Sequence, residues 1–167
     1  MEQQAAPPDP SKLDRSSKEN RWYYKDLTSH LPAMSRKLLE EYSQIPAEDV
    51  DSHVYKVRDL LWDHAPYPCI GEFKFLTLKL PLHPKYPAIL QLLTSTVSSP
   101  GPKFLDIGCC VGQELRALAQ FSEIPSEYLY GTDINGSFLT TAYDLFKDRS
   151  TFEGTLVQAD IFPVWPV

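Results

Sequence analysis

Large apolar residues recur at helical spacing in the first part of the chain. Between residues 31 and 45 they fall every three or four positions, which predicts an amphipathic helix. Pro46 interrupts this helix and suits the first turn of a second one, which would end near Ala65. The inner face of the second helix would carry four aliphatic residues: Val50, Val54, Val57 and Leu61.

The pattern is less regular between residues 67 and 102. Residues 67–84 are apolar and aromatic with imperfect alternation, so we expect an extended segment with a short strand. Residues 87–96 predict a short helix, and Ser-Ser-Pro-Gly-Pro at 98–102 predicts a domain boundary. Residues 1–20 combine prolines and charges with few large apolar side chains, which is typical of a disordered tail. We therefore divide the chain into a tail (1–20), a helical cap (21–99) and a second region (100–167).

In the second region, short apolar runs alternate with helical patterns. Strands are predicted at 103–107, 128–132 and 155–159, and helices at 112–121 and 136–149. Strands that alternate with helices in this way form a parallel sheet with right-handed crossovers. The prediction is an α/β protein in which the helical cap precedes a parallel sheet of strand order 3-2-1.

Each of the three predicted strands ends in an acid: Asp106, Asp133 and Asp160. A turn with Gly108 and Gly112 follows the first strand and leads into a helix, so the backbone there can approach a ligand closely. In nucleotide-binding units of this kind, an acid about 20 residues after the turn binds the ribose hydroxyls, and Asp133 occupies that position. Ligands of open parallel sheets bind beyond the carboxyl ends of the strands, where all three acids would lie.

Other interpretations of these residues are open at this point. One alternative is that the glycines and acids serve merely as turns and helix caps and bind no ligand. An ordinary dinucleotide site would prefer G-x-G-x-x-G, but Cys110 stands at its middle glycine. Cys109 and Cys110 are either small packing residues of the turn or redox-active thiols. Six aromatic residues either form a lid over a substrate or pack in the cap: Trp22, Tyr23, Tyr24, Tyr67, Phe73 and Phe75.

Composition excludes several classes of protein. A net charge of −6 argues against a nucleic-acid partner, which usually needs a basic face. No apolar run approaches the roughly 18 residues of a membrane span, and three cysteines cannot form a disulfide scaffold. The sequence does not start with a basic region that leads into an apolar stretch, so we expect a cytoplasmic protein. His53 and His64 would sit about 16 Å apart on one helix, too far to share a metal ion, so no metal site is predicted.

Taken together, these motifs resemble those of S-adenosylmethionine-dependent methyltransferases of the Rossmann-like class. The likeness rests on Leu-Asp-x-Gly-Cys-Cys at 105–110, Thr-Asp-Ile at 132–134 and Gln-Ala-Asp-Ile at 158–161. With Tyr-Pro-Cys-Ile-Gly at 67–71, the sequence is most similar to fungal methyltransferases of secondary-metabolite pathways, including meroterpenoid pathways. The likeness covers about residues 21–162, and residues 100–167 would be the first half of the cofactor-binding domain.

The resemblance implies S-adenosylmethionine as cofactor and assigns roles by position. Asp106, Gly108 and Gly112 would line its methionine end, and Asp133 would hold the ribose hydroxyls. Ile134 and Ile161 would lie beside the adenine. The adenine amino group would donate to Asp160. The reaction would be methylation of an oxygen on a small polyketide or terpenoid intermediate, and no catalytic base can be named.

A full sheet of this class has more strands than these three. The first strand would therefore keep an open, apolar edge, which favours self-association or pairing with a complementary chain. The resemblance thus implies a truncated enzyme that does not turn over substrate alone. The rival interpretation is a non-catalytic cofactor-binding remnant or a partner-binding subunit.

Overall fold

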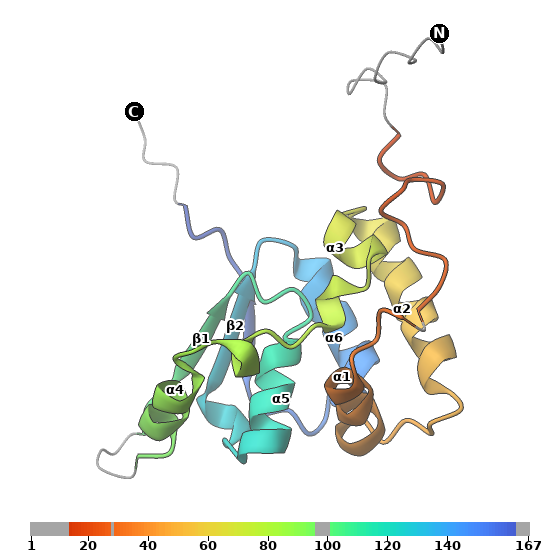
Figure 1. Ribbon diagram of the computed structural model, residues 1–167. Coiled ribbons are helices and arrows are strands. Elements are labelled where there is room, and N and C mark those ends of the chain that lie inside the picture. The colour runs from red at the N-terminus through yellow and green to blue at the C-terminus, as the bar shows by residue number, and fades with distance from the viewer. Residues whose placement is uncertain (1–13, 28, 96–100, 163–167) are drawn as a thin grey trace, which may run out of the picture.

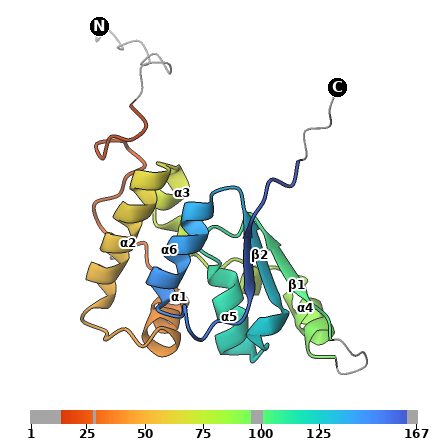
Figure 2. The ribbon, with the colours of Figure 1, turned by 180° about the vertical axis from the view of Figure 1, so that it is seen from behind.

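The computed structural model describes residues 14–27, 29–95 and 101–162. Its elements form three layers (Figure 1): a small sheet, then helices α5 (Gln113–Ser122) and α6 (Gly136–Phe146), then most of the cap helices, whereas the cap helix α4 (Tyr86–Leu93) lies at one edge of the sheet. In the cap, α2 (Val50–His64) packs along α6. Seen from behind, α6 lies between α2 and the sheet (Figure 2). The cap is thus joined to the sheet through the crossover helices.

The sheet has the predicted class and topology. It contains β1 (Phe104–Ile107), β2 (Leu129–Asp133) and β3 (Thr155–Gln158), and β2 lies in the middle. Both pairs are parallel, so the predicted order 3-2-1 is confirmed. Because the strands are parallel and in register, their carboxyl ends meet at one edge of the sheet.

The two predicted cap helices are present, with shifted limits. The first consists of α1 (Ala33–Lys37) and a π-helical turn (Leu38–Tyr42). The second begins at Val50 rather than Pro46, because residues 46–49 form a turn closed by the Asp49 N–H and the Pro46 carbonyl. Its predicted apolar face is buried in full, each residue at most 2% exposed: Val50, Val54, Val57 and Leu61.

The prediction of an extended segment at 67–84 was wrong. The chain there forms α3 (Pro68–Gly71) and two 3-10 turns (Lys74–Leu76 and Leu80–Leu82). Phe73 adopts a left-handed conformation (φ +57°) between the first two of these, and its ring is fully buried. Consecutive short turns bury apolar residues at irregular spacing, which resembles an imperfect strand pattern in the sequence.

The remaining limits are close to those predicted. The short helix α4 spans Tyr86–Leu93, and α6 ends at Phe146, three residues before the predicted limit, where Lys147 turns left-handed (φ +51°). Most of the predicted boundary at 98–102 lies outside the described residues. Of the predicted tail, residues 14–20 are described and lie against α2, where the Trp62 indole donates to the Ser16 carbonyl (2.9 Å).

One face of the sheet is covered and the other is not. α5 and α6 cover one face, whereas Leu105, Ile107 and Val157 are at least half exposed on the other. Within the described residues, β1 pairs with a strand on one edge only. No helix in the described ranges is both long and apolar enough to cross a lipid bilayer.

Candidate functional site

The turn after β1, which we call the glycine turn (residues 108–112), is held by backbone hydrogen bonds. The N–H groups of Gly108 and Cys109 both donate to the Thr132 carbonyl of β2, at 2.7 and 3.0 Å. Gly108, Cys110 and Gly112 all have positive φ angles, of +73°, +52° and +64°. A non-glycine residue is strained in this region, so Cys110 adopts a conformation that glycine would take without cost.

The two glycines of the turn have opposite surroundings. A Cβ atom added at Gly108 would meet no atom within 4 Å, so Gly108 faces open space. A Cβ atom added at Gly112 would lie 2.7 Å from Nη1 of Arg116, beneath the turn. The first glycine therefore leaves room for a ligand, and the second leaves room for the protein's own guanidinium group.

Asp133 connects the glycine turn to the start of α6. Its Oδ2 accepts the N–H of Cys110 and its Oδ1 accepts the N–H of Asn135, both at 2.9 Å. Asn135 in turn caps α6 by accepting the N–H of Ser137 (3.0 Å). Each oxygen of Asp133 keeps a second lone pair, so the fixed carboxylate can still accept a hydroxyl.

Five of the seven predicted site residues line one cavity of about 220 Å³ beyond the strand ends, which we call the strand-end cavity: Gly108, Asp133, Ile134, Asp160 and Ile161. Asp160 is exposed, and it accepts only the N–H of Phe162 (2.9 Å) among the described groups. The sequence analysis missed Thr132 and Phe162, which also line this cavity. The Thr132 hydroxyl is buried without a partner in the described part of the chain. The sequence signal for Thr132 was its position directly before Asp133.

Asp106 and Gly112 do not reach that cavity. Asp106 lines a neighbouring space of about 240 Å³ with Glu114 and with residues of the cap, Lys79 among them. Burial raises the pKa of the Asp106 carboxyl to about 6, and the nearby Glu114 and Asp133 add to the shift. Asp106 is thus held close to the glycine turn but opens toward the cap.

Glu114 links the first turn of α5 to the cap. Its Oε1 accepts the N–H groups of Lys79 and Leu80, at 2.5 and 3.0 Å. Its other oxygen is buried with no partner among the described groups, and burial raises the pKa of this carboxyl. The sequence analysis gave Glu114 no role, because its partners are backbone groups 34 and 35 positions away.

A buried ion pair supports the glycine turn from below. The Arg116 guanidinium donates to both oxygens of Asp148, at 2.8 and 3.2 Å, and to the Val111 carbonyl at 3.4 Å. Arg116 is fully buried, and Tyr42 of the cap donates its hydroxyl to the same Asp148 (2.8 Å). One connected network therefore joins the cap, α5, the end of α6 and the turn.

The cysteines and most of the aromatic residues have packing roles. Burial raises the pKa of the Cys109 thiol to about 12 and raises that of Cys110 as well, so both are protonated near neutral pH. A protonated thiol is a poor nucleophile, which favours the packing interpretation over redox chemistry. Phe73 and Phe75 are buried in the cap, whereas Tyr67 is about half exposed beside a cavity.

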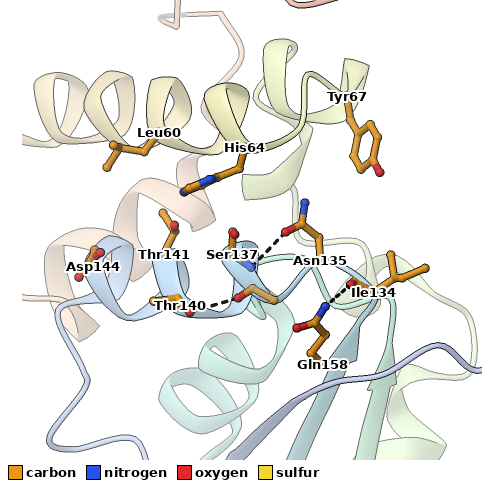
Figure 3. Close-up of a pocket in the computed structure, with 11 residues that line it drawn as sticks. Leu60, His64, Tyr67, Ile134, Asn135, Ser137, Thr140, Thr141, Asp144 and Gln158 are labelled. Atoms are coloured by element: carbon orange, nitrogen blue, oxygen red, sulfur yellow. Dashed lines mark hydrogen bonds between the residues drawn. The ribbon is translucent and has the colours of Figure 1, made fainter.

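That cavity has a volume of about 760 Å³, and we call it the interhelical cleft (Figure 3). It lies between α2 and the first turns of α6. His64 points into it, whereas His53 turns to the Leu145 carbonyl (2.9 Å). Ile134 lines both this cleft and the strand-end cavity.

Comparison with known proteins is consistent with this arrangement. Residues 22–76 match the family described as the meroterpenoid methyltransferase N-terminal domain. The chain is 46% identical to the O-methyltransferase phiE of a fungal species, over 92% of this chain and 50% of that protein. It is 39% identical to the O-methyltransferase atr3 of Stereocaulon alpinum, over 89% of this chain and 42% of that protein.

A third relative is the Asnovolin E/Chermesin D methyltransferase nvfJ of Aspergillus novofumigatus, 43% identical over 76% of this chain and 44% of that protein. The chain therefore spans about half the length of the curated relatives it matches. No solved structure matches it. The resemblance to fungal secondary-metabolite methyltransferases is confirmed, on the match of residues 22–76 and on the similarity to these relatives.

Proposed function

We propose that this chain provides the cofactor-binding part of an S-adenosylmethionine-dependent O-methyltransferase that acts on a small secondary metabolite. The observation that carries the proposal is the strand-end cavity, where five of the predicted residues meet at one edge of a parallel sheet. The similarity to proteins named O-methyltransferases supports the reaction class. We propose to divide the chain into two units, a cap at 21–99 and a half domain at 100–167.

The residues around the cavity fit such a cofactor in chemical type. Asp133 is fixed by two N–H donors and would accept both ribose hydroxyls. Asp160 would accept from the adenine amino group, with the exposed side chains of Ile134 and Ile161 against the ring. Gly108 leaves open space in which the methionine end can pass close to the backbone.

Asp106 and Gly112 would serve the methionine end in a different way from the one the resemblance implies. Gly112 is packed on Arg116, so we assign it the shape of the turn rather than contact with a ligand. Asp106 lies near Asp133 and Glu114 and would attract the positively charged amino group through space. The positive charge of that amino group would in turn favour the ionised form of Asp106 and lower its raised pKa.

The chemistry requires mainly alignment from the protein. S-adenosylmethionine supplies a methyl group that is already electrophilic, because it is bonded to a sulfonium. The described residues would bind the cofactor, fix its orientation and exclude water from one side. Holding two reactants in line accounts for a large part of such a rate enhancement. A substrate of terpenoid or polyketide type is proposed from the relatives, of which nvfJ is named for asnovolin E and chermesin D.

A second candidate is a cofactor-binding or partner-binding subunit without activity of its own. It is favoured by the apolar sheet face that no described helix covers. In that case the cofactor site forms but turnover requires a second polypeptide. Self-association through the open edge of β1 is expected in both cases.

Calorimetric titration of the chain with S-adenosylmethionine tests the proposal. We expect binding, and at least tenfold weaker binding for Asp133→Asn, because a charge-assisted hydrogen bond is worth about 1.5–3 kcal/mol. Glu153→Gln is the matched control, since it removes an exposed charge away from the cavity. Thermal melts establish that both variants are folded. The absence of heat for the parent chain, or equal affinities for it and Asp133→Asn, contradicts the proposed site.

A further inference from the structure

The interhelical cleft is separate from the strand-end cavity and has walls from two layers. The cap contributes Leu60, His64 and Tyr67, and the other wall is formed by the start of α6 and by Gln158 (Figure 3). The Gln158 amide donates to the Ile134 carbonyl (3.0 Å) and fixes the loop at the boundary of the two cavities. The cleft has the volume of sites that hold small organic molecules, which is about 300–1,000 Å³.

Thr141 places a fixed hydroxyl in the wall of the cleft. The residue is only 5% exposed, and its hydroxyl bonds to no other group among the described residues. In Figure 3 this hydroxyl points across the cleft toward α2. The neighbouring Thr140 hydroxyl instead donates to the Gly136 carbonyl (3.1 Å). The rest of the side chain is packed, whereas the hydroxyl is accessible from the cleft, so Thr141 presents an unused donor and acceptor to the cavity.

Further polar groups around Thr141 are also unused. The Ser137 hydroxyl, the His64 ring and the Tyr67 hydroxyl have no hydrogen-bond partner in the described part of the chain. Asn135 uses its carbonyl oxygen as the cap of α6, which leaves its NH₂ group free. The cleft thus offers both donors and acceptors, on neutral groups, from both walls.

Charge and apolar surface narrow the class of ligand. Asp144 is the only carboxylate among the cleft-lining residues, and none of these residues is a lysine or an arginine. Arg149 lies beside the cleft, but its guanidinium is directed at the Thr140 carbonyl (3.4 Å) and at Asp144 (3.8 Å), so the lining itself offers no cation to an anionic ligand. Leu60 and Tyr67 are 42% and 48% exposed, and their side chains suit the apolar faces of a ring system.

We propose that the interhelical cleft is a second binding site, for a neutral ring compound that carries several hydroxyl or carbonyl oxygens. Thr141, Ser137 and His64 bind its oxygens, while Leu60 and the Tyr67 ring contact its apolar faces. The site does not depend on the proposed function, because it concerns a different cavity and can be tested without the cofactor.

Hydrocortisone, a neutral fused-ring compound with hydroxyl and carbonyl groups, is the probe. In titrations of the ¹⁵N-labelled chain, we expect amide shifts centred on Ser137, Thr141 and His64. Thr141→Val keeps the shape of the side chain and removes the hydroxyl, so the probe should bind at least fivefold more weakly. Thr140→Val is the matched control, since its hydroxyl is already bonded within α6, and it should leave the affinity within twofold.

A second variant and a second ligand keep the test decisive. Leu60→Asp, at an exposed position, should also weaken the probe at least fivefold while the melting temperature stays unchanged. Saturating S-adenosylmethionine should leave the probe affinity within twofold. No shifts at the solubility limit of the probe, shifts centred on Asp160, equal effects of the two threonine variants, or competition with S-adenosylmethionine would each overturn the proposal. Failure of S-adenosylmethionine to bind would count against the proposed function and leave this result standing.

Discussion

The two sides of the glycine turn contrast in almost every physical property. Above the turn, Gly108 faces open space, and Asp160 at the neighbouring strand end is exposed. Below it, Gly112 rests on the buried guanidinium of Arg116, which is paired with Asp148. The same short segment therefore has a free surface and a rigid support.

This difference shows how a binding surface can be open and still fixed in place. Hydrogen bonds to Thr132 and Asp133 attach the turn to β2, and the network below the turn supports it from the other side. That network reaches the cap through Tyr42 and Asp148, and Glu114 adds a second connection to the cap at Leu80. The cap therefore supports the proposed cofactor site mainly from beneath.

Removal of the buried cation should have the largest effect. Arg116→Met leaves Asp148 as an unpaired charge in the interior, which typically costs about 3–5 kcal/mol of the free energy of unfolding. Arg149→Met is the control, because Arg149 is exposed and approaches Asp144 only to 3.8 Å. That variant should change stability by less than about 1 kcal/mol. Urea unfolding measures both, and similar losses would mean that the lower side is not the support we describe.

The two glycines should separate stability from binding. Alanine at either position is strained at positive φ, by roughly 1–2 kcal/mol. Gly112→Ala also brings a Cβ against the Arg116 guanidinium, which its bonds to Asp148 hold in place, so it should be the less stable variant. Gly108→Ala adds no clash but fills the open space, so it should weaken S-adenosylmethionine more. Melting curves and calorimetry would contradict this comparison if one variant showed the larger loss in both.

Asp106 should produce the smallest effect, visible as a dependence on pH. Because its pKa in the fold is raised to about 6, the protonated form stabilises the fold, and this contribution is lost as pH rises from about 4 to above 6. Asp106→Asn should therefore gain stability relative to the parent chain as pH rises, by about 1–2 kcal/mol after allowance for solvent screening. Glu153→Gln serves as the control, and unfolding at pH 4 and pH 7 makes the comparison. A difference that does not change with pH would contradict the prediction.

Much of the fold was predictable because it depends on local signals. The spacing of apolar residues and the turn signals predicted the sheet order that the structure shows. The acids at the strand ends predicted that Gly108, Asp133 and Asp160 lie at one edge, and all three line the strand-end cavity. The failure at residues 67–84 has a physical cause: short turns that are buried on several sides have no single period. Phe73, in a left-handed conformation between two of them, could not be anticipated from propensity.

The support of the site was not predictable for a different reason. Arg116 looks like an ordinary helix residue until Asp148 is placed beside it, and Glu114 bonds to backbone groups of the cap, which carry no sequence signature. Asp106 and Gly112 were assigned by resemblance to a single cavity, but packing divides them between two surroundings. Sequence patterns locate strand ends well, whereas they do not show which side of a turn a residue will face.

The hydrogen bond between Tyr42 and Asp148 has a consequence for the order of events during synthesis. Its two partners are 106 residues apart in the chain. At translation rates of about 5–20 residues per second, the cap would wait roughly 5–20 s before Asp148 is made. During that time the apolar face of α2 has no α6 to cover it. Nascent chains of this protein should therefore be good clients for ribosome-associated chaperones, and the glycine turn should be among the last parts to become rigid.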